Sequence, residues 1–332
     1  MRMRKHFATG AAMAAAATMV LTACGGGSST SPSTSSSSSD SGAPKGTITV
    51  GSAYETTDYG PITTSALGIG ADWQVLEGLY RFDMSDYSVT PALAAGDPVK
   101  VSDTKYEVTL RDGAKFSDGT DVKAADVVSS YARATDEKSI YRQFFTFVDS
   151  VEAKDDKTVT ITLKHPFAAL KERFVNVRVV PSSMSADELK SKPIGSGPYK
   201  FDNISATEVT AVPNEHYNGK IPAKAATLKW SVLKDDSARL AAALGGSIDI
   251  MEAVPADAAD KLKAASWSVD SKPGYGNPFM MFNTQKAPFD KPEVRRAFLK
   301  AIDKQKLVSS ALRGQAVEAK SFLPEANPAY KK

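Results

Sequence analysis

The sequence predicts a mixed fold of the α/β or α+β class, formed by the chain from about Lys45 onwards. Two observations predict it. Stretches with the period of a strand are interspersed with stretches of helical spacing, and no regular repeat links them. The remainder after residue 44 is also long enough to bury a sizeable core and to divide into more than one domain.

The first element predicted is a strand over 46–51, in which isoleucine and valine alternate with threonine. A polar loop follows over 52–61. Helical spacing of large apolar residues then predicts a helix over 71–79, with Trp73, Leu76 and Leu79 on one side.

The middle of the chain predicts two further alternating strands, at 106–111 and 158–163. Between them, Asp118-Gly119 is a turn signal, and a helix is predicted over 123–133. The apolar face predicted for this helix consists of Ala125, Val128 and Ala132.

The last third predicts a strand over 227–233 and a helix over 237–244 that ends at Gly245-Gly246. The apolar run 279–282 could form a short strand. A helix is predicted over 292–308, because Pro292 suits a first helical turn and apolar residues keep helical spacing after it.

The N-terminus has the pattern of an export signal, residues 1–23. Three basic residues precede an uncharged, alanine-rich stretch over 7–20, which is too short for a comfortable membrane span. The only cysteine, Cys24, closes Leu21-Thr-Ala-Cys24, which resembles the lipobox of bacterial lipoproteins. That resemblance implies diacylglycerol on the thiol, cleavage before Cys24 and acylation of the new amino terminus, as with palmitate. The alternative is a buried or chance cysteine.

Residues 24–44 are rich in Gly and Ser and predict a flexible tether.

Composition excludes several classes of function. Without the signal peptide, 38 Lys and Arg balance 38 Asp and Glu, so the chain lacks the basic footprint of a nucleic-acid binder. The lack of further cysteines excludes disulfides and cysteine-based metal sites, and the sequence predicts no cofactor.

Several segments together resemble the bacterial extracellular solute-binding proteins of family 5, which serve peptide- and nickel-type ABC importers. Their order and spacing make the combination specific, although each motif alone is weak. The matching segments are Gln74–Leu79, Pro91–Ala94, Leu110–Val128, Ile194–Phe201, Gly246–Ile250, Phe282–Asp290 and Val294–Asp303.

The resemblance implies an α/β, two-lobe fold of the periplasmic-binding-protein kind, with solute held between the lobes. Residues 45–64 and 184–277 would form the core of the first lobe, and 65–183 a subdomain inserted into it. Residues 278–332 would begin a second lobe that is incomplete, because family members continue considerably further. A fragment of a longer product is the favoured interpretation, and a shortened protein the alternative. We therefore expect residues 45–332 to bind oligopeptides poorly.

The resemblance also indicates which residues contact the solute. The loop after the first strand faces the cleft in this family, which makes Tyr54, Glu55 and Asp58 candidates. The other candidates enter the hinge, where an extended peptide could bond to the main chain: Tyr275, Gly276 and Asn277. Partial core packing is the alternative for both tyrosines. Trp73, Trp230 and Trp267 are expected in the core.

The function implied is the membrane-anchored, extracytoplasmic receptor of an ABC importer. It would capture oligopeptides or similar small solutes and pass them to separate permease and ATPase subunits. The alternatives are a surface sensor or adhesion protein on the same fold and, with less support, an envelope hydrolase. Only His165 and His216 remain after the signal peptide, and the sequence lacks the zincin, nucleophile-elbow and Walker A motifs, so we expect no enzyme.

Overall fold

The structure is a computed structural model that describes residues 43–83, 86, 88–270, 276, 278–321, 323 and 325. The signal peptide, Cys24 and most of the tether lie outside these residues. No helix within the described ranges is long and apolar enough to cross a bilayer.

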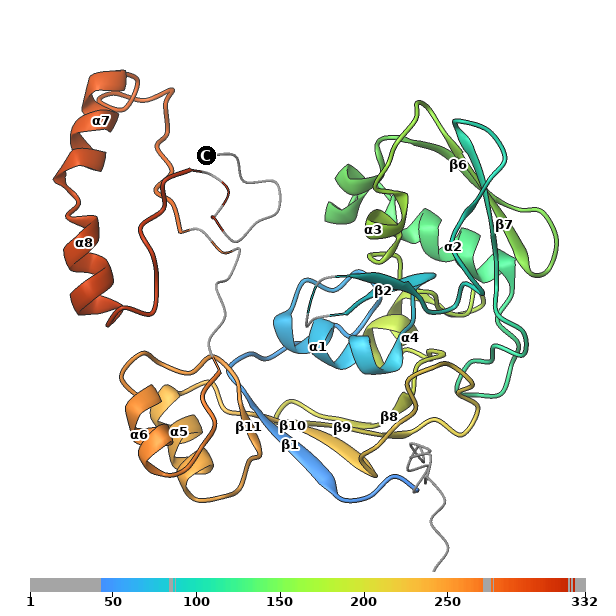
Figure 1. Ribbon diagram of the computed structural model, residues 1–332, viewed down its shortest axis with the longest axis horizontal. Helices are drawn as coiled ribbons and strands as arrows, with labels where there is room; N and C mark the ends of the chain where they lie inside the picture. The colour runs from blue at the N-terminus through green and yellow to red at the C-terminus, as the bar shows by residue number, and fades with distance from the viewer. Residues whose placement is uncertain are drawn as a thin grey trace, which may run out of the picture. The chain divides into compact units, whose positions relative to one another are not determined.

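A five-stranded sheet joins the start of the described chain to segments far along the sequence (Figure 1). Its strands lie in the order β11-β1-β10-β9-β8. Strand β1 runs parallel to both of its neighbours, with Thr47 opposite Thr227 and Val50 opposite Ile250, and the other pairs are antiparallel. The bounds are β1 (Thr47–Ser52), β8 (Tyr199–Ile204), β9 (Glu208–Pro213), β10 (Thr227–Val232) and β11 (Ile250–Met251). The strands predicted at 46–51 and 227–233 are thereby confirmed.

Helices cover both faces of this sheet. Helix α1 (Ala66–Val75) packs with Tyr199 and Val50 in one apolar cluster. The next residue, Gly51, points to the opposite face, where a Cβ would lie 3.4 Å from Cγ of Arg239 in α5 (Asp236–Leu244). Helix α1 therefore packs on the five-stranded sheet, although its sequence falls in the segment 65–183 predicted to form the insert. The division into lobes remains a prediction.

The prediction of a helix over 71–79 is wrong in its bounds, because α1 begins five residues earlier and ends at Val75. Leu76 has extended backbone angles, and the chain then enters strand β2 at Tyr80. Leu76 and Leu79 are fully buried, but they reach the core from an extended segment. Helical spacing therefore predicted the burial of Leu76 and Leu79 correctly, but it was wrong about their secondary structure and about Trp73, which is 36 % exposed.

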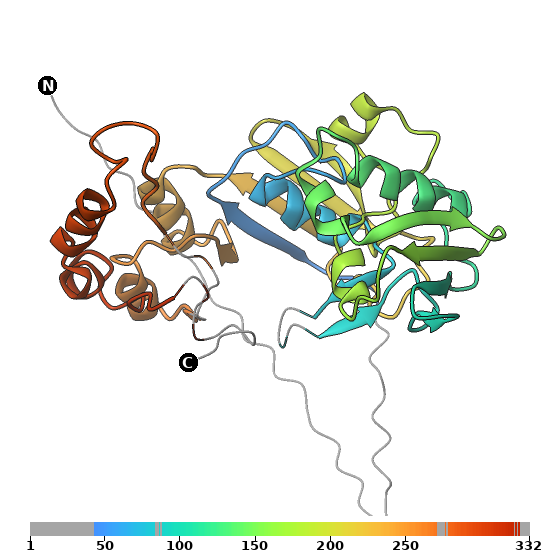
Figure 2. The same ribbon diagram turned by 90° about the horizontal axis from the view of Figure 1, so that it is seen from above.

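A second, antiparallel sheet organises the region between residues 99 and 163, with strand order β4-β5-β7-β6. Figure 2 shows this region in teal and green, and helix α2, which is labelled in Figure 1, contacts β6 and β7. The predicted strands at 106–111 and 158–163 correspond to β5 and β7. The elements between β1 and β8 other than α1 are β2 (Tyr80–Phe82), β3 (Val89–Pro91), β4 (Val99–Lys100), β5 (Lys105–Thr109), α2 (Ala124–Ala134), η1 (Ile140–Phe145), β6 (Val148–Ala153), β7 (Thr158–Leu163), α3 (Leu170–Phe174) and α4 (Ala186–Ser191).

Helix α2 has the predicted position but a different buried face. Of the predicted face, Ala125 and Ala132 are exposed and Val128 is half-buried against the core, whereas Ala124, Val127 and Ala134 are buried. The face is rotated because Asp126 is itself buried in the first turn, where it accepts bonds from the Lys123 and Ser182 amides.

Two glycines of the family motifs lie at positions where the backbone requires glycine. Gly119 has φ +88° in the predicted turn, in the left-handed region that favours glycine. At Gly197, a Cβ would lie 2.6 Å from the Gln74 carbonyl oxygen, and its amide donates to the Val75 carbonyl at 2.8 Å. In the Ile194–Phe201 motif, this glycine therefore allows the chain that leads into β8 to pack directly against the end of α1.

The C-terminal region is mostly exposed. The run 279–282 is not a strand, and Phe279 and Met281 are 70 % and 81 % exposed. The helix predicted over 292–308 ends at Ala301, because Ile302 takes extended angles, and a new turn begins after Asp303. The elements here are α6 (Ala259–Ala264), α7 (Pro292–Ala301), α8 (Lys304–Lys306) and the π-turn η2 (Leu307–Ala311).

Candidate functional site

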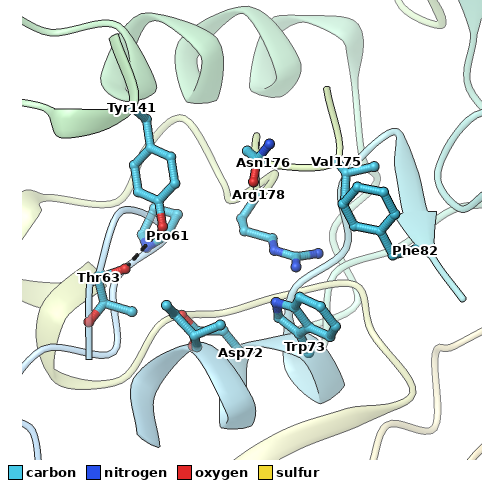
Figure 3. A pocket seen from close by; sticks show the side chains of 10 residues that line it. Pro61, Thr63, Asp72, Trp73, Phe82, Tyr141, Val175, Asn176 and Arg178 are labelled. Carbon is cyan, nitrogen blue, oxygen red and sulfur yellow. Dashed lines mark hydrogen bonds between the residues drawn. The ribbon is translucent and has the colours of Figure 1, made fainter. Parts of the chain in front are cut away.

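A cavity of about 220 Å³ lies among α1, the loop after β1, β2, η1 and the segment that follows α3 (Figure 3). Its walls are largely apolar, with a few polar groups. This composition is typical of small-molecule sites, although such sites usually exceed about 300 Å³. The cavity therefore suits one chemical group of a solute better than a whole peptide. The lining residues that matter chemically are Thr63, Asp72, Trp73, Tyr141 and Arg178.

Asp72 is a buried carboxylic acid in the middle of α1. It is 3 % exposed, and its Oδ1 has no hydrogen-bond partner within the described part of the chain. Burial raises the pKa of Asp72 well above its ordinary value, and the nearby Asp58 adds to the rise, while Arg178 opposes it. The site therefore favours the neutral form of Asp72.

Arg178 supplies the positive charge of the cavity. Its guanidinium lies over the Trp73 ring, with Cζ 5.4 Å from the ring centroid, and Figure 3 shows it extending into the space between the walls. Burial lowers the pKa of Arg178 to about 10, which leaves the group charged at neutral pH. Within the described residues it makes neither a hydrogen bond nor an ion pair, with Asp72 or any other group.

Tyr141 closes another side of the cavity. Its hydroxyl donates to the Thr63 carbonyl at 3.2 Å, the bond drawn in Figure 3, and so ties η1 to the loop after β1. Burial raises the pKa of Tyr141, so its proton stays on the hydroxyl at neutral pH. The ring is thus a fixed wall with its polar end already paired.

The loop residues predicted to contact solute lie just before this cavity. Tyr54 is 45 % exposed, and Glu55 forms an exposed ion pair with Lys234 at 2.9 Å. Asp58 accepts from the Gly60 amide at 2.8 Å and thereby shapes the turn that leads to Pro61 in the cavity wall. Asp58 thus lies near enough to Asp72 to contribute to the rise in its pKa, whereas Tyr54 and Glu55 are exposed to solvent.

The hinge candidates are only partly described. Gly276 is exposed, and a Cβ there would meet no heavy atom within 4 Å. Tyr275 and Asn277 lie outside the described residues.

Sequence reasoning missed the charged pair of the cavity and misplaced one aromatic. Trp73 was expected in the core but is 36 % exposed and forms the cavity wall beneath Arg178. Trp230 is buried as expected, and Trp267 is half-buried against the α5–α6 cluster. A usable signal was present: Asp72 is the only charged residue of α1, and Arg178 stands within a run of valines.

The sheet topology and the region inserted between β1 and β8 define the class: the fold is that of the two-lobe periplasmic binding proteins. The murein tripeptide binding protein MppA of Escherichia coli has this fold, with a TM-score of 0.77, 24 % identity and coverage of 87 % of this chain and 62 % of MppA. Residues 88–332 match the sequence profile of the bacterial extracellular solute-binding proteins, family 5. The chain belongs to that family.

Two relatives are more similar in sequence. The glutathione-binding protein GsiB of Salmonella typhi is 30 % identical over 292 residues, which cover 83 % of this chain and 56 % of GsiB. AgaA of A. tumefaciens R10, solved in complex with agropinic acid, is 29 % identical with a TM-score of 0.71, over 81 % of this chain and 56 % of AgaA. The chain thus spans little more than half the length of these relatives. All three are binding proteins, and the family is one of transport components rather than enzymes.

Proposed function

We propose that this chain is the solute-capturing component of an ABC importer and takes up oligopeptides or similar small solutes. The observation that carries the proposal is the cavity beside the loop after β1. There, a family 5 chain holds a charged guanidinium and a buried acid that have no partner within the described residues. Unpaired buried polar groups are costly, so they are expected where a ligand completes them.

The names of the relatives support this class of solute. GsiB binds glutathione, MppA a murein tripeptide, and AgaA was solved with agropinic acid. In this proposal the cavity holds one group of the solute. Tyr54, Glu55 and Asp58 line the approach to it, and residues 275–277 bond to the solute main chain near the hinge.

The same proposal includes delivery to a permease driven by separate ATPase subunits. It also includes anchoring outside the cytoplasmic membrane through lipid on Cys24. Two or more acyl chains anchor a protein stably, whereas one chain binds only marginally.

Binding is tested on the protein purified from the cells that make it. Calorimetry with glutathione and with a mixed tripeptide pool should give saturable heat, and the bound solute should raise the melting temperature. If none of these solutes gives saturable heat or raises the melting temperature, the proposal is contradicted. Enzymatic turnover that is lost when His165 or His216 is replaced would also contradict it.

Anchoring is tested with Cys24→Ser and a labelled fatty acid fed to the cells. The label should enter the wild-type protein only, and the variant should keep its signal peptide. Equal labelling of the two proteins would contradict a lipid on Cys24.

A further inference from the structure

We propose that Asp72 is a pH-sensitive latch of the cavity. While Asp72 carries its proton, the cavity is open to a group of the solute. When Asp72 is ionised, its carboxylate pairs with Arg178 across the cavity and excludes that group. This inference rests on the proposed function and adds the condition under which the site accepts a solute.

The first argument is the position of Asp72. Aspartate is disfavoured in a helix interior, yet Asp72 lies in the middle of α1 and is the only charged residue of that helix. It lines the cavity at 3 % exposure, and its Oδ1 has no hydrogen-bond partner within the described part of the chain. Two other buried acids, Glu77 and Asp126, accept hydrogen bonds with both carboxylate oxygens. An unpaired buried acid destabilises the fold, which indicates a role for Asp72 in the cavity.

The second argument is the set of groups that face Asp72. They are Asp58 and Tyr59 of the loop after β1, Tyr141 of η1 and Arg178 of the segment after α3. Both tyrosines keep their protons at neutral pH, because burial raises the pKa of Tyr59 to about 12 and also raises the pKa of Tyr141. Burial raises the pKa of Asp72, Arg178 lowers it, and Asp58 raises it further. Arg178 is therefore the cation available to an ionised Asp72.

The third argument is that Arg178 is not fixed elsewhere. Its guanidinium lies over the Trp73 ring, with Cζ 5.4 Å from the centroid, and makes no hydrogen bond to any described residue. The other charged groups near it are Arg81, which repels it, and Glu77, whose oxygens already accept other bonds. A bidentate bond to a carboxylate is stronger than stacking on a ring. Loss of the Asp72 proton therefore draws the guanidinium from the ring to the carboxylate.

The size of the cavity turns this pairing into closure. Asp72 and Arg178 reach the cavity from opposite walls, and the space between the walls is only about 220 Å³ (Figure 3). A pair that spans this space occupies it and also uses the polar atoms that a solute would otherwise bond to. The apparent affinity then follows the fraction of the open form. It is constant below the folded-state pKa of Asp72 and falls by up to about tenfold per pH unit above it.

The first test needs no solute. The Trp73 indole N–H resonance of the ¹⁵N-labelled full chain, assigned with Trp73→Phe, is followed from pH 5 to pH 9. Wild type should show one titration step, because the guanidinium leaves the ring when Asp72 ionises. Asp72→Asn and Asp72→Ala should show no step, and circular dichroism confirms that each variant is folded. Asp103→Asn is the matched control: it removes an exposed acid between β4 and β5 and should keep the step.

The second test measures binding. Calorimetry with glutathione and with a mixed tripeptide pool gives the affinities of wild type and Asp72→Asn across the same pH range. The ratio of the wild-type affinity to that of Asp72→Asn cancels the titration of the solute itself. This ratio should stay constant below the step seen at Trp73 and fall by up to about tenfold per pH unit above it.

The outcomes separate the latch from the proposed function. A Trp73 resonance that does not titrate, or that titrates equally in both Asp72 variants, would overturn the inference and leave the proposed function standing. A ratio of affinities that is independent of pH would do the same. An Asp72-dependent step in a protein that binds neither glutathione nor tripeptides at pH 5 would support the latch and contradict the proposed function.

Discussion

Two buried acids lie five residues apart in the sequence and meet arginines in different ways. Glu77 is bonded to Arg111 at 2.7 and 2.9 Å, and Arg111 donates further to the Ala92 carbonyl. Asp72 lies as deeply buried near Arg178, yet no bond joins them. Burial raises the pKa of both acids, but only for Glu77 do hydrogen bonds from arginine pull it back.

The difference separates a structural pair from the pair that we propose for solute binding. The Glu77–Arg111 pair connects the end of α1 to the end of β5 and has its donors and acceptors used within the protein. The Asp72–Arg178 pair stands on opposite walls of a cavity with its polar atoms unused. The Glu77–Arg111 pair contributes to the fold. In our proposal the unused donors and acceptors of Asp72 and Arg178 are available to a solute.

The largest expected effect comes from breaking each pair at its arginine. Arg111→Met should lower the free energy of unfolding by about 3–5 kcal/mol, because it leaves a buried acid without its partner. Arg178→Met should change it by less than about 1 kcal/mol, since only stacking is lost. Urea unfolding of both variants checks this, and similar losses would remove the distinction between the pairs.

A smaller effect concerns pH and the acid of the Asp72–Arg178 pair. The folded-state pKa of Asp72 is raised, so the folded protein holds a proton there that the unfolded chain releases above about pH 4. The resulting stability is complete below that pH and is lost as pH rises through the folded-state pKa. Asp72→Asn cannot ionise, so it should gain stability relative to wild type as pH rises.

Urea unfolding of wild type and Asp72→Asn between pH 4 and pH 9 measures this difference. Glu55→Gln, which replaces an exposed carboxylate by an amide, is the control for the swap itself. A gap between wild type and Asp72→Asn that stays constant with pH would show that Asp72 is ionised throughout.

The smallest effect belongs to the exposed pair of the predicted loop. Glu55 and Lys234 are each about 60 % exposed, and such pairs contribute about 0–1 kcal/mol. Lys234→Ala should therefore move the melting temperature by no more than about 2–4 °C. A larger loss that persists in 1 M salt would mean that this loop is held more firmly than its exposure indicates.

Sequence patterns predicted most strands and helices because period and punctuation are local properties. The patterns misplaced α1 and the buried face of α2. Tertiary contacts of Leu76 determine where α1 ends, and those of Asp126 determine which face of α2 is buried. The family resemblance gave the loop at 54–58, but the cavity required Asp72 and Arg178, which are 106 residues apart. No local spacing brings them together; only the packing of η1 and the segment after α3 against α1 does so.

The parallel pairing of β1 has a consequence for the time course of synthesis. Its partners β10 and β11 end about 180 and 200 residues later, whereas β5, β6 and β7 find one another within the stretch between them. At about 5–20 residues per second, β1 waits roughly 10–40 s for its neighbours after it is made. During that wait both of its edges are open to pairing with other chains. Strand β1, an interior strand of the sheet, is thus made first and paired last. A chain that is kept unfolded until its synthesis ends would not expose β1 in a partly formed sheet.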